Sequence, residues 1–333
     1  MSRRPLLLLL GGLLVAAGFS WFLPRTPEPG RSFPADPDRT TRAERPARPV
    51  RVVPANAGTA DLILQLLPLE RVAALPEVAF THSFLAGAAA GGSQALAAQP
   101  TDGRSTNVRS WADLPRFRGY EAETFLDLEA DLVVSHAWQN AETTALLERH
   151  GIPVLELELP ESWEDVLAAL LVCGRALGVE DRARERVLSL RTRASLLEGA
   201  SPELAGLRAL SYSNLGSGGW VAGSRTTADI LFSLVGVRNA AAEDGIEGHA
   251  SIDVERFLGL DPDVIVVGTL ADGDGQSPTA AYLHGESSLA GLRALRENKI
   301  VVLPPRLFTS SSTELLAAAE LLRERLVALG GAR

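Results

Sequence analysis

The sequence predicts an α/β protein of two lobes, each built on a central, mainly parallel sheet, with the lobes joined by a single long backbone helix. Three observations support this expectation. Helical and strand patterns alternate from residue 50 to the end of the chain, which is typical of parallel α/β folds. Two sequence elements occur twice, in the same order. A purely helical stretch lies between the two copies.

The N-terminal segment 1–24 carries the pattern of an exported protein. Arg3 and Arg4 precede an uncharged run, and positive charge before an apolar core keeps that end in the cytoplasm. The segment is therefore a signal peptide or a transmembrane anchor. Trp21 and Phe22 close the run as interfacial aromatics do, which favours an uncleaved anchor. Either way we expect an extracytoplasmic, periplasmic protein, tethered to the inner membrane if the segment is kept.

The rest of the chain divides by composition and pattern. Residues 25–49 are rich in Pro, Arg, Asp and Glu and lack apolar periodicity, which predicts a disordered linker. We then expect an N-terminal α/β lobe over 50–160, connecting helices over 161–200 and a C-terminal α/β lobe over 201–333.

An internal repeat predicts that the two lobes are related. The run Thr-Ala-Asp-Leu-Ile-Leu at 59–64 returns as Thr-Ala-Asp-Ile-Leu-Phe at 227–232. A second match aligns 123–134 with 255–266, which share Glu, Phe, Leu and Asp at identical spacing. The separation of the two elements differs, so the first half carries extra residues, which we place within 86–103.

Each copy contains a strand and helix followed by a second helix and strand. Short apolar strands are expected at 50–54 and 209–212, and Thr59 and Thr227 are suitable N-caps for the helices that follow. The later, buried strands are expected at 132–134 and 264–267. Ligands usually bind at the carboxyl ends of such parallel strands.

Two helices are expected between the lobes. The first covers 162–177, with Ser162 as its N-cap and Gly178 as its stop. The second covers about 181–197 and is roughly 25 Å long, enough to cross from one lobe to the other. A helical crossing is stiffer than a pair of loops, so we expect the lobes to move little relative to each other.

The bulk properties exclude one class of partner. The chain of 333 residues has a net charge of −9, and no basic stripe interrupts its acidic character, so we expect no nucleic acid partner. The acidic balance fits a soluble monomer. Cys173, the single cysteine, closes an apolar helical run and is expected to be buried.

Several of these segments resemble the cobalamin and iron-siderophore substrate-binding proteins of ABC importers, whose lobes are joined by one backbone helix. The resemblance covers roughly 50–329. It rests on Arg-Val-Val-Pro with the Thr-Ala-Asp run, on Ala-Asp-Leu-Val-Val and Asp-Pro-Asp-Val-Ile, and on Glu-Asn-Lys-Ile-Val-Val-Leu at 297–303. It implies a transport protein and not an enzyme, with a membrane permease and its ATPase as partners.

In that family one glutamate on each lobe contacts arginines of the permease. The matching residues are Glu123 and Glu255, which the repeat identifies independently as equivalent positions. Two symmetric carboxylates can form bidentate pairs with two guanidinium groups. The alternative interpretation is that each is a first-turn acid favoured by the helix dipole.

A ligand pocket is expected at loops that follow the strands. Large flat aromatics suit a macrocycle or a catecholate, and an arginine suits an anionic chelate. We therefore expect an iron chelate (siderophore), haem or cobalamin as the ligand, with no tightly bound cofactor. The candidate ligand-binding residues are Asn56, His82, Phe84, His136, Trp138, Trp220, His249, Arg306 and Phe308.

Two other functions stay open. His82, His136 and His249 come from three loops that could converge on a divalent metal, and one histidine could serve as an axial ligand to haem iron. The same fold could also form a sensor or accessory protein without transport. A metal-dependent enzyme is not expected, because no close His/Asp/Glu motif has the spacing of metal ligands. The Gly-rich run 214–220 is not expected to bind a nucleotide, because it lacks the Lys-Ser/Thr ending of a nucleotide loop.

Overall fold

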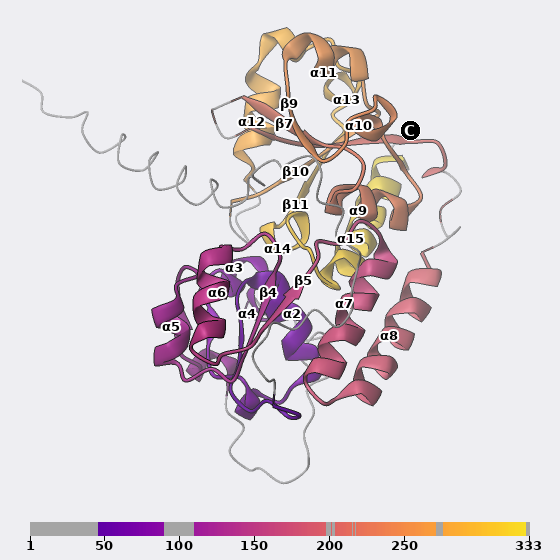
Figure 1. The fold of residues 1–333 in the computed structure, drawn as a ribbon. Coiled ribbons are helices and arrows are strands. Elements are labelled where there is room, and N and C mark those ends of the chain that lie inside the picture. Colours follow the sequence, from indigo (N-terminus) through magenta and orange to yellow (C-terminus); the bar gives the residue numbers. More distant parts are fainter. Residues whose placement is uncertain are drawn as a thin grey trace, which may run out of the picture. The chain divides into compact units, whose positions relative to one another are not determined.

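The computed structural model describes residues 46–89, 110–197, 201, 204–214, 216, 218–270 and 276–330 (Figure 1). The predicted signal peptide or anchor, nearly all of the predicted linker and most of the segment expected to hold the extra residues lie outside these ranges. Within them, no helix is long and apolar enough to cross a membrane.

The N-terminal lobe is built on a three-stranded parallel sheet in the order β1–β4–β5. Val52 pairs with Leu132, and Val133 pairs with Val154, so β4 lies in the centre. These strands are β1 (Val52–Pro54), β4 (Leu132–His136) and β5 (Val154–Leu157). A separate parallel pair joins β2 (Leu75–Pro76) to β3 (Arg116–Phe117). The helices are α2 (Ala57–Leu66), α3 (Ala79–His82), α4 (Phe84–Ala89), α5 (Ala122–Asp127) and α6 (Ala141–Arg149).

The C-terminal lobe has a six-stranded sheet in the order β11–β10–β6–β7–β9, with β8 also paired to β6. The strands β8, β6, β10 and β11 pair in parallel, whereas β7 is antiparallel to both of its neighbours, β6 and β9. The strands are β6 (Arg208–Asn214), β7 (Gly219–Ala222), β8 (Arg238–Asn239), β9 (His249–Ile252), β10 (Val264–Gly268) and β11 (Ile300–Leu303). The helices are α9 (Thr227–Val235), α10 (Ala240–Glu243), α11 (Val254–Leu260), α12 (Pro278–Gly285), α13 (Arg293–Arg296), α14 (Pro305–Phe308) and α15 (Glu314–Gly330).

Alternation along the strands divides the apolar side chains between separate cores. Val133 of β4 points into a core that includes Phe125 of α5. Its neighbours Leu132 and Val134 belong to a second core on the other face of the sheet, as the period of two requires. That second core also contains Val266 of β10, so one continuous apolar core runs through both lobes. Separate apolar cores lie on the remaining face of each sheet.

Two helices, α7 (Trp163–Ala176) and α8 (Glu180–Ser195), connect the lobes and lie side by side (Figure 1). Ser162 is the N-cap of α7, as predicted, and the helix ends just before Gly178. In α8, Arg186 donates a hydrogen bond to Gln65 of the N-terminal lobe. About two turns later, Arg193 pairs with Glu320 of α15 at 2.8 Å. The long helix α8 therefore touches both lobes.

The repeat is visible in the strand pairing. β1 pairs with β4 in the first lobe as β6 pairs with β10 in the second. Glu129 and Asp261, which are equivalent in the two copies, both adopt left-handed backbone angles, with φ of 47° and 34°. Such angles are uncommon outside glycine, so the repeat extends to the shape of the turn between helix and strand.

An arginine fixes this turn in each lobe. Arg51 donates from Nε to the carbonyl of Glu129, at 3.0 Å, and from its terminal nitrogen to that of Leu128. Arg208 makes the same kind of bond to the carbonyl of Leu260, at 2.8 Å. Asp131 and its equivalent Asp263 accept backbone N–H groups from the start of the neighbouring strand.

The prediction that Thr59 and Thr227 are N-caps is wrong. The side chain of Asn56 caps α2 and accepts the N–H of Thr59 at 3.0 Å, whereas Thr59 lies three residues inside as the partner in a capping box. In the second copy the cap is Thr226, one residue earlier than predicted. Both helices start earlier because a better-placed polar side chain precedes the threonine of the repeat.

Candidate functional site

The ends of β1 and β4 bring Asn56 and His136 together. The Asn56 amide nitrogen and Nδ1 of His136 are 3.0 Å apart, and the oxygen of the same amide accepts the N–H of Thr59. Because that oxygen is engaged, the NH₂ group donates to Nδ1, which leaves the proton of the neutral ring on Nε2. His136 is 2% exposed, and burial lowers its pKa to about 4, so the ring is neutral near pH 7.

This arrangement does not favour His136 as an iron ligand. An imidazole binds a metal through an unprotonated nitrogen. Here Nδ1 lies within hydrogen-bond distance of the Asn56 amide nitrogen, which can only donate, so the proton of the neutral ring is assigned to Nε2. The geometry instead makes His136 a buried hydrogen-bond acceptor for the Asn56 amide beside the start of α2.

The start of α2 also meets the other lobe. A Cβ atom added at Gly58 would lie 2.4 Å from Oγ of Ser311 and 3.2 Å from Cε1 of His136. Ser311 lies between α14 and α15 in the C-terminal lobe. The missing side chain at Gly58 therefore lets a segment of the second lobe approach the strand ends of the first.

Two of the predicted loops are in fact short helices, and they contact each other. Residues 81–84 form the end of α3 and the start of α4, and residues 306–308 lie in α14. α14 contacts both α3 and α4, which brings His82 and Phe84 of one lobe near the segment of Arg306 and Phe308 in the other. Phe308 packs on the backbone of Gly268, where a Cβ would be 2.6 Å from its ring. The Gly-rich run 214–220 is also partly a strand, because β7 begins at Gly219.

Charge at this contact is already balanced. Arg306 pairs with Glu314 at 3.1 Å, and both side chains are largely buried. Burial raises the pKa of the Glu314 carboxyl, while Arg306 opposes that rise. An anionic ligand at Arg306 would therefore compete with Glu314.

The tryptophans differ in exposure. Trp138 follows β4 and is 41% exposed, one of the largest exposed apolar side chains in the described residues. Trp220 is half-buried on β7, opposite Ser213 and Ser251. His249 starts β9 opposite Ala222 and is exposed.

The structure does not gather the histidines into a metal site. Within the described residues, which include all of the candidates, no three His, Cys, Asp or Glu side chains are grouped so as to hold a metal ion. Nδ1 of His82 instead lies 2.7 Å from Oγ1 of Thr81. Cys173 is fully buried, as expected, and burial raises its pKa to about 12.

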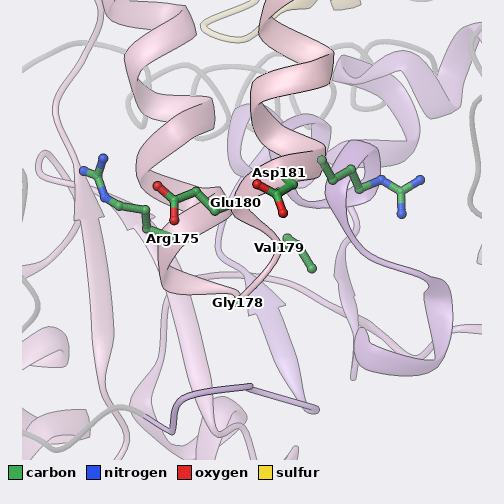
Figure 2. Close-up of a pocket in the computed structure, with 6 residues that line it drawn as sticks. Arg175, Gly178, Val179, Glu180 and Asp181 are labelled. Carbon is green, nitrogen blue, oxygen red and sulfur yellow. The ribbon is translucent and has the colours of Figure 1, made fainter.

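Glu123 and Glu255 are the second residues of α5 and α11, and both are exposed. Both lie in the first turn of their helix, where the dipole favours an acid. A hollow is found elsewhere, on the turn between α7 and α8 (Figure 2). It is lined by Arg175, Gly178, Val179, Glu180, Asp181 and Arg182, none of which is a candidate ligand residue.

Sequence reasoning missed Asp61. This residue of α2 is 1% exposed and accepts hydrogen bonds from the N–H of Phe84 and the hydroxyl of Ser312. Burial raises the pKa of its carboxyl well above the usual value, and the charge of Glu314 raises it further, while the donated hydrogen bonds oppose the rise. The signal was present, because Asp61 belongs to the repeated Thr-Ala-Asp run, but its partners are distant in sequence.

Comparisons with known proteins give one family. A family model described as "Periplasmic binding protein" matches residues 94–307. A search of curated protein sequences finds no significant match. Solved structures with the same fold include the periplasmic heme-binding protein RhuT from Roseiflexus sp. RS-1, at 21% identity and a TM-score of 0.67, covering 84% of this chain and 98% of that one.

Two further structures show how varied the ligands of this fold are. A protein of the ABC-type Fe3+-hydroxamate transport system from Saccharomonospora viridis has 20% identity and a TM-score of 0.64, covering 84% of this chain and 94% of that one. The molybdate-binding protein MolA of Haemophilus influenzae has 14% identity and a TM-score of 0.64, covering 86% of this chain and 88% of that one. At these identities the similarity establishes the two-lobed fold.

Proposed function

The chain belongs to the periplasmic binding protein family, and on that premise we propose that it is the extracytoplasmic substrate-binding component of an ABC importer. The members of this family are substrate-binding proteins of transport systems, so no catalytic turnover is proposed. Its partners are then a membrane permease with its ATPase, and a small-molecule ligand held between the lobes. The N-terminal segment 1–24 exports the chain and, if it is not cleaved, tethers it to the inner membrane.

We propose that the ligand is an iron chelate or haem. The observation that carries this choice is the contact of α14 with α3 and α4, which brings the Phe308 and Phe84 segments of the two lobes together in one apolar core. Trp138 offers a further large, exposed aromatic face. Two of the similar structures cited above are named for heme and for Fe3+-hydroxamate. Cobalamin remains a third ligand to test.

The proposed roles of the site residues follow from their surroundings. Trp138, Trp220 and Phe308 provide apolar faces, and His82 and His249 provide polar groups at the edge. Phe84 is buried and supports the site from within the core. Asn56 and His136 support the site without touching the ligand, because His136 is buried. Arg306 meets an anionic ligand group in competition with Glu314.

The proposed docking points are Glu123 and Glu255, one on each lobe. The support is their equivalence, since both are exposed at the same position of repeat-related helices. A permease that presents two arginines could bind both carboxylates at once, which would fix orientation as well as affinity.

Ligand-dependent thermal stabilisation tests the ligand class. The full chain, kept in mild detergent because of its N-terminal segment, is heated with haemin, ferrichrome, cyanocobalamin or molybdate. A ligand that binds only the folded state stabilises it by about 2.7 kcal/mol at a hundredfold excess over Kd. We expect a clear rise in Tm with haemin or ferrichrome and none with molybdate. A rise with molybdate alone would exclude the proposed ligand class.

The alternative function, binding of a bare divalent metal ion, is not supported by the positions of the histidines. It depended on the convergence of three histidines, which the described residues do not provide. A sensor or accessory role without transport would use the same ligand site and is distinguished by uptake measurements in cells.

A further inference from the structure

One buried carboxyl receives hydrogen bonds from both lobes. Oδ1 of Asp61 accepts the N–H of Phe84 at 3.0 Å, and Oδ2 accepts the hydroxyl of Ser312 at 2.7 Å. Phe84 begins α4, in the part of the N-terminal lobe that contacts α14. Ser312 lies in the C-terminal lobe, just before α15. The two donors therefore share a single acceptor group although they belong to different lobes.

Asp61 is the middle of a row on α2. Gly58, Asp61 and Gln65 lie three and four residues apart and so share one face of the helix. They meet consecutive residues of the other lobe. Oγ of Ser311 closes on Gly58, the hydroxyl of Ser312 bonds Asp61, and Oγ1 of Thr313 accepts Nε2 of Gln65 at 2.6 Å.

Hydrogen bonds within the C-terminal lobe hold Ser312 in place. Its hydroxyl accepts the N–H of Glu314, and its own N–H donates to Oγ of Ser310, each at 3.2 Å. Ser312 is fully buried, as are Ser310 and Thr313 to within a few per cent. The Asp61 carboxyl therefore connects the Phe84 segment to a fixed point of the other lobe.

We propose that Asp61 is a positioning residue that sets the place of the buried Phe84 segment, beside the proposed ligand site, according to the position of the other lobe. This inference rests on the proposed function for its use of the ligand site. A buried carboxyl oxygen that loses its hydrogen-bond donor is left unsatisfied, which costs free energy. We therefore expect the carboxyl to move with its donors. A displacement of Ser312 is transmitted through the carboxyl to the amide of Phe84, and a ligand that moves Phe84 acts on Ser312 in return.

The coupling predicts an effect that crosses between lobes. Ser312→Ala removes the donor to Asp61 in the C-terminal lobe, together with the acceptor of the Glu314 N–H, and leaves the N–H of Phe84 in place. We expect the amide of Phe84, in the N-terminal lobe, to exchange its hydrogen at least about tenfold faster in this variant, because its acceptor is no longer held. Thr313→Ala is the matched control. It removes the neighbouring contact to Gln65 in the same row and leaves the bonds from Phe84 and Ser312 to Asp61 in place.

The two parts of the contact should also be non-additive. Asp61→Ala frees the Phe84 amide directly, so Ser312→Ala should add no further exchange in that background. Asp61→Asn keeps an oxygen to accept the N–H of Phe84 and should restore part of its protection. The proposal is overturned if Ser312→Ala leaves exchange at Phe84 unchanged, or if Thr313→Ala accelerates it equally.

The experiment separates the two proposals because exchange is measured on the full chain without any ligand. The second readout is the affinity for haemin and ferrichrome. We expect Ser312→Ala to weaken binding of whichever compound stabilises the wild type, and Thr313→Ala to leave it within about twofold. If neither compound binds the wild type, the proposed ligand class fails, while exchange at Phe84 still decides the role of Asp61.

Discussion

Glu123 and Glu255 occupy the same position, the second residue, of α5 and α11, and both side chains are exposed. Among the described residues neither has an ion-pair or hydrogen-bond partner for its side chain. Both helices lead through the same left-handed turn, at Glu129 and Asp261, into a buried strand. The two carboxylates are thus presented by structurally equivalent units.

Replacing both glutamates tests the docking proposal. In the double variant Glu123→Gln and Glu255→Gln we expect ligand uptake by cells to fall at least about tenfold, because two charge-assisted pairs with the permease are lost. Affinity of the isolated protein for its ligand should not change. The measurements are uptake of the iron compound that binds and a direct binding titration.

The matched control uses glutamates outside the repeat. Glu142 is also an exposed second residue of a helix, α6, and Glu324 is exposed on α15. Their double substitution by Gln should leave uptake intact. Unchanged uptake in the Glu123 and Glu255 variant would remove the docking claim and favour a sensor or accessory role.

Gly58 is predicted to be required for the lobe contact. In Gly58→Ala the new methyl group would lie 2.4 Å from Oγ of Ser311 and 3.2 Å from Cε1 of His136, so the Ser311 hydroxyl must rotate or its segment must move. We expect a loss of about 1–3 kcal/mol in the free energy of unfolding in urea, as for other overpacked sites. Adding Ser311→Ala should recover most of it.

A second glycine provides the control for helix propensity. Gly259 lies in α11, and a Cβ added there would have no atom within 4 Å, so Gly259→Ala should be neutral or stabilising. If Gly58→Ala is equally well tolerated, the close approach at Ser311 does not restrict that position.

His136 predicts a pH dependence of stability. Its pKa is about 4 in the folded protein against 6.5 as the ordinary value, so the unfolded chain takes up the proton first as pH falls. The stability that depends on the neutral ring is complete above about pH 6.5 and is lost progressively toward pH 4. Between about pH 7.5 and 5 the loss amounts to roughly 2 kcal/mol.

Urea unfolding at several pH values measures this loss. His136→Gln should flatten the curve over that interval, whereas His150→Gln, at the exposed C-cap of α6, should keep the wild-type slope. The same slope in the His136 variant and the wild type would show that this ring does not change its proton affinity on folding.

Arg208 is expected to stabilise its lobe more than Arg51 does. Arg208 bonds the carbonyl of Leu260 and pairs with Glu243, and its side chain is 28% exposed. The side chain of Arg51 is 47% exposed. Arg208→Ala should cost about 2 kcal/mol in the free energy of unfolding and Arg51→Ala about 1 kcal/mol.

The control for Arg208 is an exposed ion pair of the same type. Arg191, on α8, pairs with Glu164 at the surface. Arg191→Ala should change the free energy of unfolding by less than about 1 kcal/mol. Equal effects at Arg191 and Arg208 would mean that the bonds to the turn carbonyls contribute little.

The larger elements could be predicted because their signals are local. The buried strands β4 and β10 are short apolar runs, and Ser162 stands at the right distance before an apolar helical pattern. The repeat added the pairing of related strands in the two lobes. These features depend on the periodic spacing of apolar residues and on helix capping, and both are determined by residues that are close in the sequence.

The site could be predicted only in outline because its contacts are distant in sequence. Asp61 and Ser312 are 251 positions apart. Nothing near Asp61 indicates that its carboxyl is buried by the other lobe. The short helices α3 and α14 lack the length for a periodic signal, and β7 begins in a Gly-rich run that is typical of a loop. Tertiary packing decides each of these segments.

Fluorescence titration of the full chain with haemin and with ferrichrome tests the central claim most directly. Trp138 and Trp220 are proposed to face the ligand, whereas Trp163 begins α7 in the connecting helices. We predict saturable quenching at one ligand per chain, with affinity reduced about tenfold or more in Trp138→Ala and in Trp220→Ala, and unchanged in Trp163→Phe. Absence of saturable binding by either compound, or equal weakening by Trp163→Phe, would contradict the account.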